Sequence, residues 1–267
     1  MKPIHITSRD NSLLRRVRAV RDGKIDELIF VEGLRLCEEA LSSGLKIDAA
    51  IYSEELARKD RAASLISELS NVANKTATVS EKLLASISYT RTPQGIIVLS
   101  SRPAIEQTQF KTQQPVAPLL VIMHGINNPV NVGAILRTAE AAGATGAITT
   151  ANTSNPFSPK ALRGAMGSAF RLPIWMGPNY SDVVTWCDET GIRTICAALD
   201  GQETHTEVNW RGPCALILGP ESSGLSSAEL AGANQVVRVP MRGAVESLNV
   251  AVAAGVLLYE AARQRGP

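Results

Sequence analysis

Three segments of the sequence combine polar side chains with glycine or proline directly after an apolar run. In an open α/β sheet such segments follow the carboxyl ends of the strands, which is where ligands bind. The arginine, asparagine, glutamate and serine side chains in these segments are of the types that hold a polar substrate and assist a proton transfer. The segments are Gly125–Ala139, Leu218–Ser226 and Val239–Ala253.

The segment Leu218–Ser226 resembles a phosphate-binding loop in spacing but not in chemistry. Gly219 and Gly224 have the Gly-x-x-x-x-Gly spacing of that loop, yet Leu225 stands where a lysine should follow. Glu221 places a negative charge where phosphates would lie. The loop is therefore predicted not to bind a nucleoside triphosphate, although its glycines indicate a close backbone approach.

The other two segments each have a structural and a chemical interpretation. Arg137 is predicted to lie one helical turn beyond Gly133, which leaves space beside the guanidinium; a solvated arginine on a capped surface helix is the alternative. Ser247 is predicted to cap the last helix. Asn249 would then lie inside an apolar Ala/Val helix, where a buried amide needs a partner, so we expect it to bond backbone or a ligand. His124 is interpreted as a strand-end histidine with satisfied hydrogen bonds.

The elements that would position these residues form two α/β units, 1–100 and 118–267, joined by a polar, Gln-rich linker over 101–117. In the second unit, the continuous apolar run at 119–123 is typical of a strand buried on both faces. Strands and helices alternate from there on, which predicts a mostly parallel sheet covered on both sides. Helices are predicted over 11–21, 33–41, 56–69, 129–142, 159–170, 180–190 and 247–263, and strands over 27–31, 47–52, 76–79, 95–99, 119–123, 147–150, 193–199, 215–218 and 236–239.

Composition excludes several classes of protein. The net charge is +2 and aromatic residues make up 4%, so composition alone disfavours an RNA partner. The four cysteines lack the spacing of a metal site, so buried thiols and no metal are expected. The chain has no secretory signal pattern and no run of about 18 apolar residues, so a cytoplasmic protein without a membrane span is expected.

Taken together, the three segments resemble the signature motifs of the SpoU–TrmH family. Its members are S-adenosylmethionine-dependent RNA ribose 2′-O-methyltransferases of the SPOUT superfamily. Each motif alone is a weak signal, but three in order, each after a predicted strand, are specific. The matching positions are Asn131, Gly133 and Arg137 in the first motif, Gly219, Glu221 and Gly224 in the second, and Pro240, Met241, Ser247, Leu248 and Asn249 in the third.

The N-terminal unit resembles the substrate-binding domain of the family's rRNA-modifying branch. The similar stretches are Phe30–Leu41 and Thr92–Ile96. That domain is itself similar to ribosomal proteins that bind kinked RNA. The resemblance thus implies an α/β protein in which a small ribosomal-protein-like domain precedes a parallel-sheet domain with a deep trefoil knot. It also implies a homodimer with the active site near the interface.

The resemblance further implies a set of site residues and S-adenosylmethionine as the cofactor. The catalytic set would be Asn131, Arg137, Glu221, Ser247 and Asn249, and the cofactor pocket would be lined by Leu199, Gly219, Val239, Met241 and Leu248. Arg137 would act either as the general base or as a holder of the target phosphate that lowers the pKa of the hydroxyl. The second role suits a guanidinium, which stays protonated in proteins.

RNA contacts are expected from local positive charge. Arg15, Arg16 and Arg18 lie on the predicted basic helix, and Arg91 lies in a loop beside Tyr89. A solvated helix face is the alternative. The expected function is methylation of a ribose 2′-hydroxyl in RNA, foremost large-subunit (23S-type) rRNA. The alternatives are a tRNA 2′-O-methyltransferase, a base methyltransferase of the same fold, and an RNA-binding member that has lost catalysis.

Overall fold

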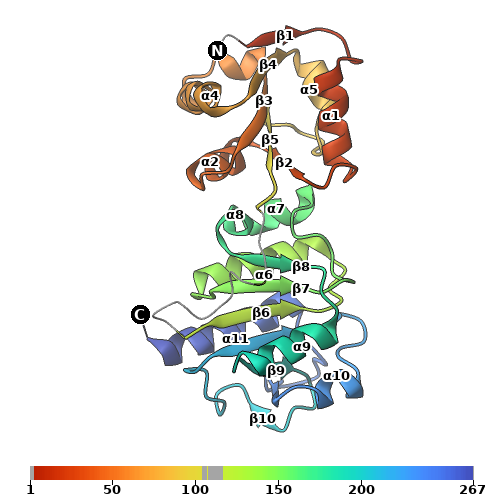
Figure 1. Ribbon diagram of the computed structural model, residues 1–267, viewed down its shortest axis with the longest axis vertical. Helices are drawn as coiled ribbons and strands as arrows, with labels where there is room; N and C mark the ends of the chain where they lie inside the picture. The colour runs from red at the N-terminus through yellow and green to blue at the C-terminus, as the bar shows by residue number, and fades with distance from the viewer. Residues whose placement is uncertain (1–2, 104–106, 108–116, 267) are drawn as a thin grey trace. The chain divides into compact units, whose positions relative to one another are not determined.

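The computed structural model describes residues 3–103, 107 and 117–266. Contacts divide the chain into two compact units, Met1–Ala104 with Phe157–Phe170 and Ile105–Pro156 with Arg171–Pro267. Most of the predicted linker over 101–117 lies outside the described residues. Figure 1 shows the elements of both units, coloured along the chain.

The first unit has a mixed sheet in the order β1-β4-β3-β5-β2. β1, β4 and β3 pair in parallel, whereas β3 with β5 and β5 with β2 are antiparallel. The strands are β1 (Ile4–Ile6), β2 (Leu28–Glu32), β3 (Ile47–Ser53), β4 (Lys75–Val79) and β5 (Ile96–Ser101). The helices are α1 (Ser12–Arg21), α2 (Leu34–Ser42), α3 (Glu54–Ala57), α4 (Asp60–Val72), α5 (Glu81–Ile87) and, grouped with this unit by contacts, α7 (Pro159–Ala165).

Helix α1 shows how the sequence pattern produces the packing. The Asn11 side chain accepts a hydrogen bond from the backbone N–H of Leu13 and begins the helix. Leu14, Val17 and Val20 recur at helical spacing and are buried against the sheet, so the arginines between them lie on the outer side. The helix predicted over 11–21 is confirmed.

Two elements of the first unit differ from the sequence prediction. The helix predicted over 56–69 is two helices, because Lys59 is extended between α3 and α4. Strand β1 is absent from the prediction because it has three residues, two of them exposed, and so carries no hydrophobic alternation.

The second unit has a sheet in the order β10-β12-β9-β11-β6-β7-β8, and every pairing among its described residues is parallel. The predicted parallel sheet is confirmed. The strands are β6 (Leu119–Met123), β7 (Gly146–Thr149), β8 (Ile174–Met176), β9 (Arg193–Ala197), β10 (Glu203–Thr204), β11 (Cys214–Leu218) and β12 (Gln235–Arg238). The helices are α6 (Pro129–Ala141), α9 (Tyr180–Glu189), α10 (Ser227–Ala231) and α11 (Val250–Arg265), whereas α8 (Ser168–Arg171) is grouped by contacts with the first unit up to Phe170.

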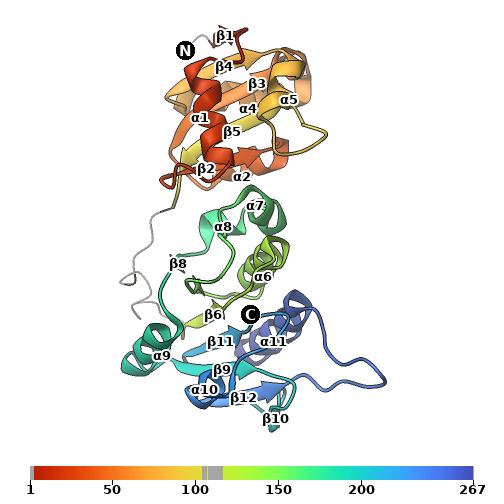
Figure 2. The ribbon, with the colours of Figure 1, turned by 90° about the vertical axis from the view of Figure 1, so that its right-hand side faces the viewer.

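Helices cover both faces of this sheet. Leu120 and Ile122 of β6 pack with Val183 and Trp186 of α9. Because side chains alternate along a strand, the neighbouring apolar residues of β6 point to the other face. Helices α6 and α11 pack against each other there, and Figure 2 shows them on the opposite side of the sheet from α9. All five residues of β6 are buried, as predicted from its apolar run.

Helix ends in the second half of the chain correct two predictions. The helix predicted over 159–170 is interrupted at Met166 and Gly167, which both have positive φ, so α7 ends there and α8 begins anew. The last helix begins at Val250 rather than at Ser247. Asn249 is its N-cap and accepts a hydrogen bond from the backbone N–H of Ala251 at 2.9 Å. An asparagine that is unfavourable inside a helix is favourable at this position.

Candidate active site

The polar residues of the three motifs gather at the carboxyl edge of the parallel sheet in the second unit. The first motif follows β6 on α6, and the second follows β11, which pairs directly with β6. The third follows β12 and leads into α11, which packs on α6. The topology therefore brings together segments more than a hundred residues apart in the sequence.

Asn131 is the centre of a hydrogen-bonded chain that joins all three motifs. Its amide Nδ2 donates to Glu221 Oε1 at 2.8 Å. Its Oδ1 accepts from Asn249 Nδ2 at 3.3 Å. Glu221 Oε2 also accepts from the backbone N–H of Asn127 at 3.4 Å. Asn131 is 8% exposed, so this network satisfies a buried amide and fixes the two loops and the start of α11 against each other.

Arg137 lies apart from this chain. It is six residues beyond Asn131, which places the two side chains about 120° apart around α6. The Arg137 side chain is exposed, and within the described residues it makes no hydrogen bond or ion pair. The guanidinium is thus available to an external anion, in contrast to Asn131, which is committed to Glu221 and Asn249.

Ser247 is exposed in the segment between β12 and α11. Because Asn249 caps α11, Ser247 does not have the capping role predicted from the sequence. No hydrogen bond of its hydroxyl is found among the described residues. Of the five predicted catalytic residues, the structure therefore joins Asn131, Glu221 and Asn249 directly and leaves Arg137 and Ser247 exposed near them in the sequence.

The residues predicted to line a cofactor pocket follow neighbouring strands. Leu199, Gly219 and Val239 come shortly after β9, β11 and β12, and β9 lies between the other two strands. Leu199 is 61% exposed, which is unusual for a leucine beside a strand end. Met241 and Leu248 are half-buried in the segment between β12 and α11. Apolar side chains beside exposed loop backbone suit a ligand with both polar and apolar parts.

Two glycines lie at tightly packed positions in the loops after β6 and β11. A Cβ on Gly219 would lie 2.8 Å from Leu225 Cγ and 3.0 Å from the Leu225 backbone nitrogen. Gly125 has φ +64°, and a Cβ there would lie 2.8 Å from Pro220 Cγ. A side chain at Gly219 would displace Leu225 within the loop after β11, whereas one at Gly125 would push Pro220 away from the loop after β6. The loops after β6 and β11 are therefore in direct contact at their bases.

The arginines predicted to contact RNA differ in their surroundings. Arg16 forms an ion pair with Asp48 at 3.0 Å, and Arg18 donates to the backbone carbonyl of Arg9. Arg15 and Arg91 are exposed, and the described part of the chain offers neither of them a partner. The structure thus leaves two of the four guanidinium groups wholly available for phosphate contacts.

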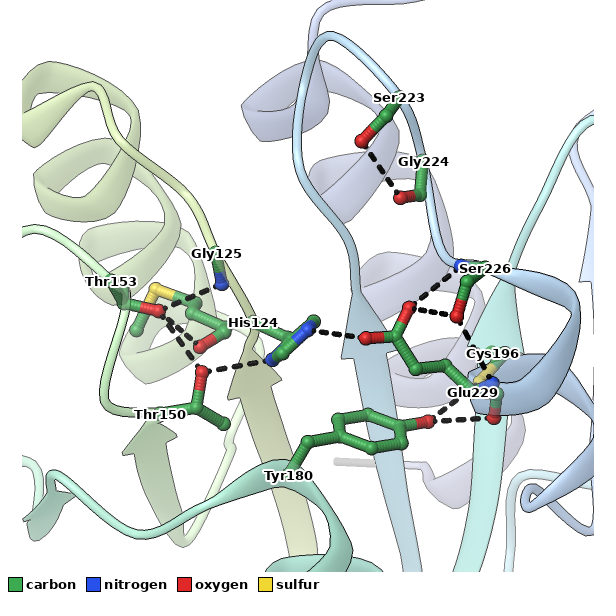
Figure 3. Close-up of polar contacts among 11 residues, drawn as sticks. His124, Gly125, Thr150, Thr153, Tyr180, Cys196, Ser223, Gly224, Ser226 and Glu229 are labelled. Atoms are coloured by element: carbon green, nitrogen blue, oxygen red, sulfur yellow. Dashed lines mark hydrogen bonds and ion pairs between the residues drawn. The ribbon is translucent and has the colours of Figure 1, made fainter.

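Two groups of residues around these sites were missed by the sequence analysis. In the first unit, Glu32 accepts hydrogen bonds from the backbone N–H groups of Tyr89 and Thr90 and from the side chains of Ser88 and Thr90. In the second unit, Glu229 bonds His124 (Figure 3). The spacing of Ser226 and Glu229, which form a capping box, is the signal that could have revealed Glu229.

His124 has the satisfied hydrogen bonds predicted for it. Its Nδ1 lies 2.9 Å from Thr150 Oγ1 and its Nε2 lies 2.8 Å from Glu229 Oε1. Burial disfavours ionisation of Glu229, but the hydrogen bonds from Ser226 and His124 outweigh it and hold the pKa of this carboxyl below its ordinary value.

The cysteines are buried and reduced. Burial raises the pKa of Cys187 to about 12 and that of Cys196 to about 11, and it also raises the pKa of Cys37 and Cys214. Such thiols are poor nucleophiles and poor metal ligands at neutral pH.

Across the residues that the structure describes, no group of His, Cys, Asp or Glu side chains is arranged to hold a metal ion. No helix in the same residues is long and apolar enough to cross a membrane.

Comparisons with known proteins agree with this arrangement. The family model of the SpoU rRNA methylases matches residues 118–259, and that of the MRM3-like substrate binding domain matches residues 13–98. An uncharacterized tRNA/rRNA methyltransferase of Synechocystis sp. is 31% identical over 97% of this chain and 94% of the relative. The 23S rRNA (guanosine-2′-O-)-methyltransferase RlmB of Vibrio vulnificus is 29% identical over 88% of this chain and 97% of that enzyme.

A solved structure extends the likeness to three dimensions. The AdoMet-bound rRNA methyltransferase of Sinorhizobium meliloti superimposes with a TM-score of 0.84 over 97% of both chains, at 28% identity. The match covers nearly the whole chain and therefore spans both units. With a family model covering more than half of its length and relatives matched almost end to end, the chain belongs to the SpoU rRNA methylase family.

Proposed function

We propose that this protein transfers a methyl group from S-adenosylmethionine to a ribose 2′-hydroxyl of rRNA. The observation that carries the proposal is the chain of hydrogen bonds from Glu221 through Asn131 to Asn249, which joins all three family motifs. The same edge of the sheet carries the apolar and glycine positions expected of a cofactor pocket. The solved relative from Sinorhizobium meliloti binds AdoMet, and the Vibrio vulnificus relative is a guanosine-2′-O-methyltransferase of 23S rRNA.

The residues around the pocket fit this cofactor. Leu199, Met241 and Leu248 offer apolar surface, and the absence of a side chain at Gly219 lets the Leu225 side chain pack directly on the loop backbone. When bound, S-adenosylmethionine supplies a methyl group on a sulfonium that is already activated for displacement. The protein then has two tasks, which are to align the 2′-oxygen and to favour loss of its proton.

Arg137 is proposed to perform both tasks. Its exposed guanidinium, without a protein partner in the described residues, can hold a phosphate next to the target ribose. A positive charge beside the 2′-hydroxyl lowers the pKa of that hydroxyl and stabilises the developing oxyanion. In this role Arg137 stays protonated and the hydroxyl gives its proton to solvent water, so no deprotonated arginine is required, which is why we favour it over a general base. Ser247 is proposed to contact the ribose from the segment between β12 and α11.

We also propose that the protein acts as a homodimer through α6 and α11. Val130 and Arg137 are seven residues apart on α6 and share one face, and Val252 and Tyr259 do the same on α11. The three apolar side chains are 43%, 54% and 56% exposed, although α6 and α11 pack against each other. An exposed apolar stripe across two neighbouring helices suits a second copy, which would place Arg137 at the interface.

The deep trefoil knot of the family is part of the same proposal. Two features support it: β12 pairs with β9 beyond β11 in the sheet, and α11 then returns to pack on α6.

For the substrate we propose rRNA bound by residues 1–100, with Arg15 and Arg91 as phosphate contacts and Arg16 and Arg18 beside Arg15 on α1. Residues 118–267 would form the catalytic domain. An enzyme that acts on rRNA would work in the cytoplasm.

The proposal is tested by incubating the protein with methyl-labelled S-adenosylmethionine and total RNA, followed by mass mapping of the labelled nucleotide. We expect one ribose-methylated nucleotide in large-subunit rRNA and strongly reduced label with the Arg137→Ala variant. A label on a base, or on tRNA, would replace the proposed substrate with one of the alternatives. Absence of label from RNA, together with absence of cofactor binding in calorimetry, would contradict the enzymatic proposal.

A further inference from the structure

His124 and Glu229 form a contact that the proposed reaction does not use. His124 follows β6 directly and precedes the first motif, and Glu229 lies on α10 just beyond the second motif. The side chains are 14% and 26% exposed, and Nε2 lies 2.8 Å from Oε1. Figure 3 shows the imidazole between the two loops, with Glu229 on one side and Thr150 on the other.

The surrounding hydrogen bonds anchor both partners. Glu229 Oε2 accepts from the Ser226 backbone N–H at 2.6 Å and from Ser226 Oγ at 2.8 Å. On the other side, Thr150 Oγ1 lies 2.9 Å from His124 Nδ1. Thr153 Oγ1 donates to the Met123 carbonyl and accepts from the Gly125 backbone N–H. The contact thus connects the loops after β7, β6 and β11 in one line.

Tyr180 of α9 encloses the contact from a third side. Its ring centroid lies 4.7 Å from that of His124, and its hydroxyl donates to the Glu229 backbone carbonyl at 2.9 Å. The carboxylate of Glu229 can only accept a hydrogen bond, so His124 donates to it through Nε2, while Nδ1 lies against the Thr150 hydroxyl. Both ring nitrogens therefore have a hydrogen-bond partner. The geometry therefore specifies one orientation of the ring.

We propose that His124 and Glu229 are a positioning pair that fixes the spacing between the loops after β6 and β11 and thereby sets the affinity for the methyl donor. This inference rests on the proposed function for the identity of the ligand. The two loops touch at Gly125 and Pro220 and are joined again by Glu221 and the Asn127 backbone. The pair adds a third connection, from the residue after β6 to α10 at the end of the loop that begins at Gly219, which is a predicted pocket residue.

A matched pair of variants tests this proposal. In His124→Gln the amide nitrogen reaches the place of Nε2 and keeps a donor for Glu229. In His124→Asn, which is one methylene shorter, the amide reaches the place of Nδ1 and keeps only the contact with Thr150. Both substitutions are neutral amides, so the variants differ in whether the loops stay connected. Ser226→Ala is the control, because it removes a helix cap but leaves the Glu229 carboxylate beside His124.

The measurements are calorimetric titration with S-adenosylmethionine, kcat at saturating cofactor, and hydrogen exchange of both loops without cofactor. We expect His124→Asn to weaken binding about tenfold, or about 1.4 kcal/mol, with kcat within about twofold of the wild type. Exchange should accelerate in residues 125–128 and 219–225. His124→Gln should lose no more than about threefold in affinity, and Ser226→Ala should leave exchange in residues 125–128 unchanged.

Equal losses for the Gln and Asn variants, or unchanged affinity in both, would overturn the proposal. So would a fall in kcat at saturating cofactor without weaker binding, because a positioning pair acts on the pocket and not on the displacement. If the wild-type protein fails to bind S-adenosylmethionine, the proposed function fails, but hydrogen exchange still decides the role of the pair. Faster exchange of both loops in the Asn variant alone supports it, and the same exchange in both variants rejects it.

Discussion

Two glutamates organise loops in this chain, one in each unit, and they do so in different ways. Glu32 lies at the end of β2, is 8% exposed and receives hydrogen bonds from three consecutive residues, Ser88, Tyr89 and Thr90. Glu221 lies within an exposed loop and receives hydrogen bonds from Asn131 and from the backbone of Asn127.

The difference separates a carboxylate that maintains the fold from one that arranges a site. Removal of Glu32, itself 8% exposed, would leave the part-buried backbone N–H groups of Tyr89 and Thr90 without their acceptor, which costs free energy whatever the protein does. Removal of Glu221 would leave the Asn131 amide and the exposed Asn127 backbone N–H without this acceptor, both at the edge of the sheet and outside its apolar core, so we expect the fold to persist while the alignment of the motifs is lost. We therefore expect substitutions around Glu32 to change stability and those around Glu221 to change activity.

The largest effect on activity is expected at Arg137, which α6 carries but which makes no hydrogen bond or ion pair in the described residues. Arg137→Ala should lower kcat/KM by about a thousandfold, or about 4 kcal/mol, because both phosphate binding and oxyanion stabilisation disappear. The thermal midpoint should stay within about 2 °C, since Arg137 has no partner in the described residues to lose. Single-turnover kinetics with rRNA checks the rate, and calorimetry checks that cofactor affinity is retained.

Arg137→Lys is the matched control for this prediction. A lysine keeps the charge but loses the planar, bidentate donor geometry of the guanidinium. An intermediate rate supports a role in holding phosphate. A rate close to that of the wild type at neutral pH would contradict any specific need for the guanidinium.

Glu32→Ala is expected to have the second largest effect, on stability. The loss should be about 3 kcal/mol, because the Tyr89 and Thr90 backbone N–H groups and two hydroxyls lose their shared acceptor. RNA affinity should fall as well, since the loop carries Arg91, whereas cofactor affinity should not change. Denaturant unfolding monitored by hydrogen exchange in residues 88–95 measures the effect, with Glu32→Gln as the milder variant. If the Glu32→Ala protein is as stable as the wild type and residues 88–95 still exchange slowly, Glu32 does not maintain the fold and the two glutamates do not differ in this way.

Glu221→Gln tests the second half of the contrast, which is that Glu221 affects activity more than stability. The amide oxygen can still accept from Asn131, but the second oxygen that accepts from the Asn127 backbone is replaced by a donor. We expect kcat/KM to fall about tenfold to thirtyfold, or about 1.5–2 kcal/mol, with an unchanged thermal midpoint. Steady-state kinetics measures the change in kcat/KM, and calorimetric melting of the same samples measures the thermal midpoint. A large loss of stability with little loss of rate would mean that Glu221, like Glu32, serves the fold.

The two regions also differ in how far the sequence predicts them. The parallel sheet of the second unit follows from buried apolar runs such as Leu119–Met123 alternating with helices, and the motif positions follow from family resemblance. The partner of Glu32 could not be foreseen, because the contact joins residues 56 positions apart and nothing in Ser88-Tyr89-Thr90 marks them as donors. Local signals found the loops, whereas the contacts between loops required the three-dimensional structure.

Asn249 shows the same limit at a single position. The sequence indicated that its amide needs a partner, and the structure supplies two, the Ala251 backbone N–H and Asn131 Oδ1. The prediction was wrong about where the helix begins, since Ser247 is as good an N-cap as asparagine by residue type. Tertiary contact with Asn131 distinguishes the two positions, and no local pattern reports that contact.

The smallest effect is expected at the arginines of the first unit. Arg15→Gln combined with Arg91→Gln should weaken rRNA binding about tenfold and reduce the slope of log affinity against log salt by about 1–2, because each arginine would neutralise one phosphate. Stability should be unchanged, since the described residues give neither side chain a partner. Filter binding at several salt concentrations measures both quantities.

Arg16→Gln is the matched control, because the guanidinium of Arg16 is already paired with Asp48 at 3.0 Å. An arginine held by a carboxylate must give up that contact, or share it, before it neutralises a phosphate. We therefore expect Arg16→Gln to lower RNA affinity by less than either exposed arginine does and to leave the salt slope almost unchanged. If instead Arg16→Gln flattens the slope as much as the double variant, the whole of α1 contacts RNA. The ion pair with Asp48 would then be an arrangement of the free protein that RNA displaces.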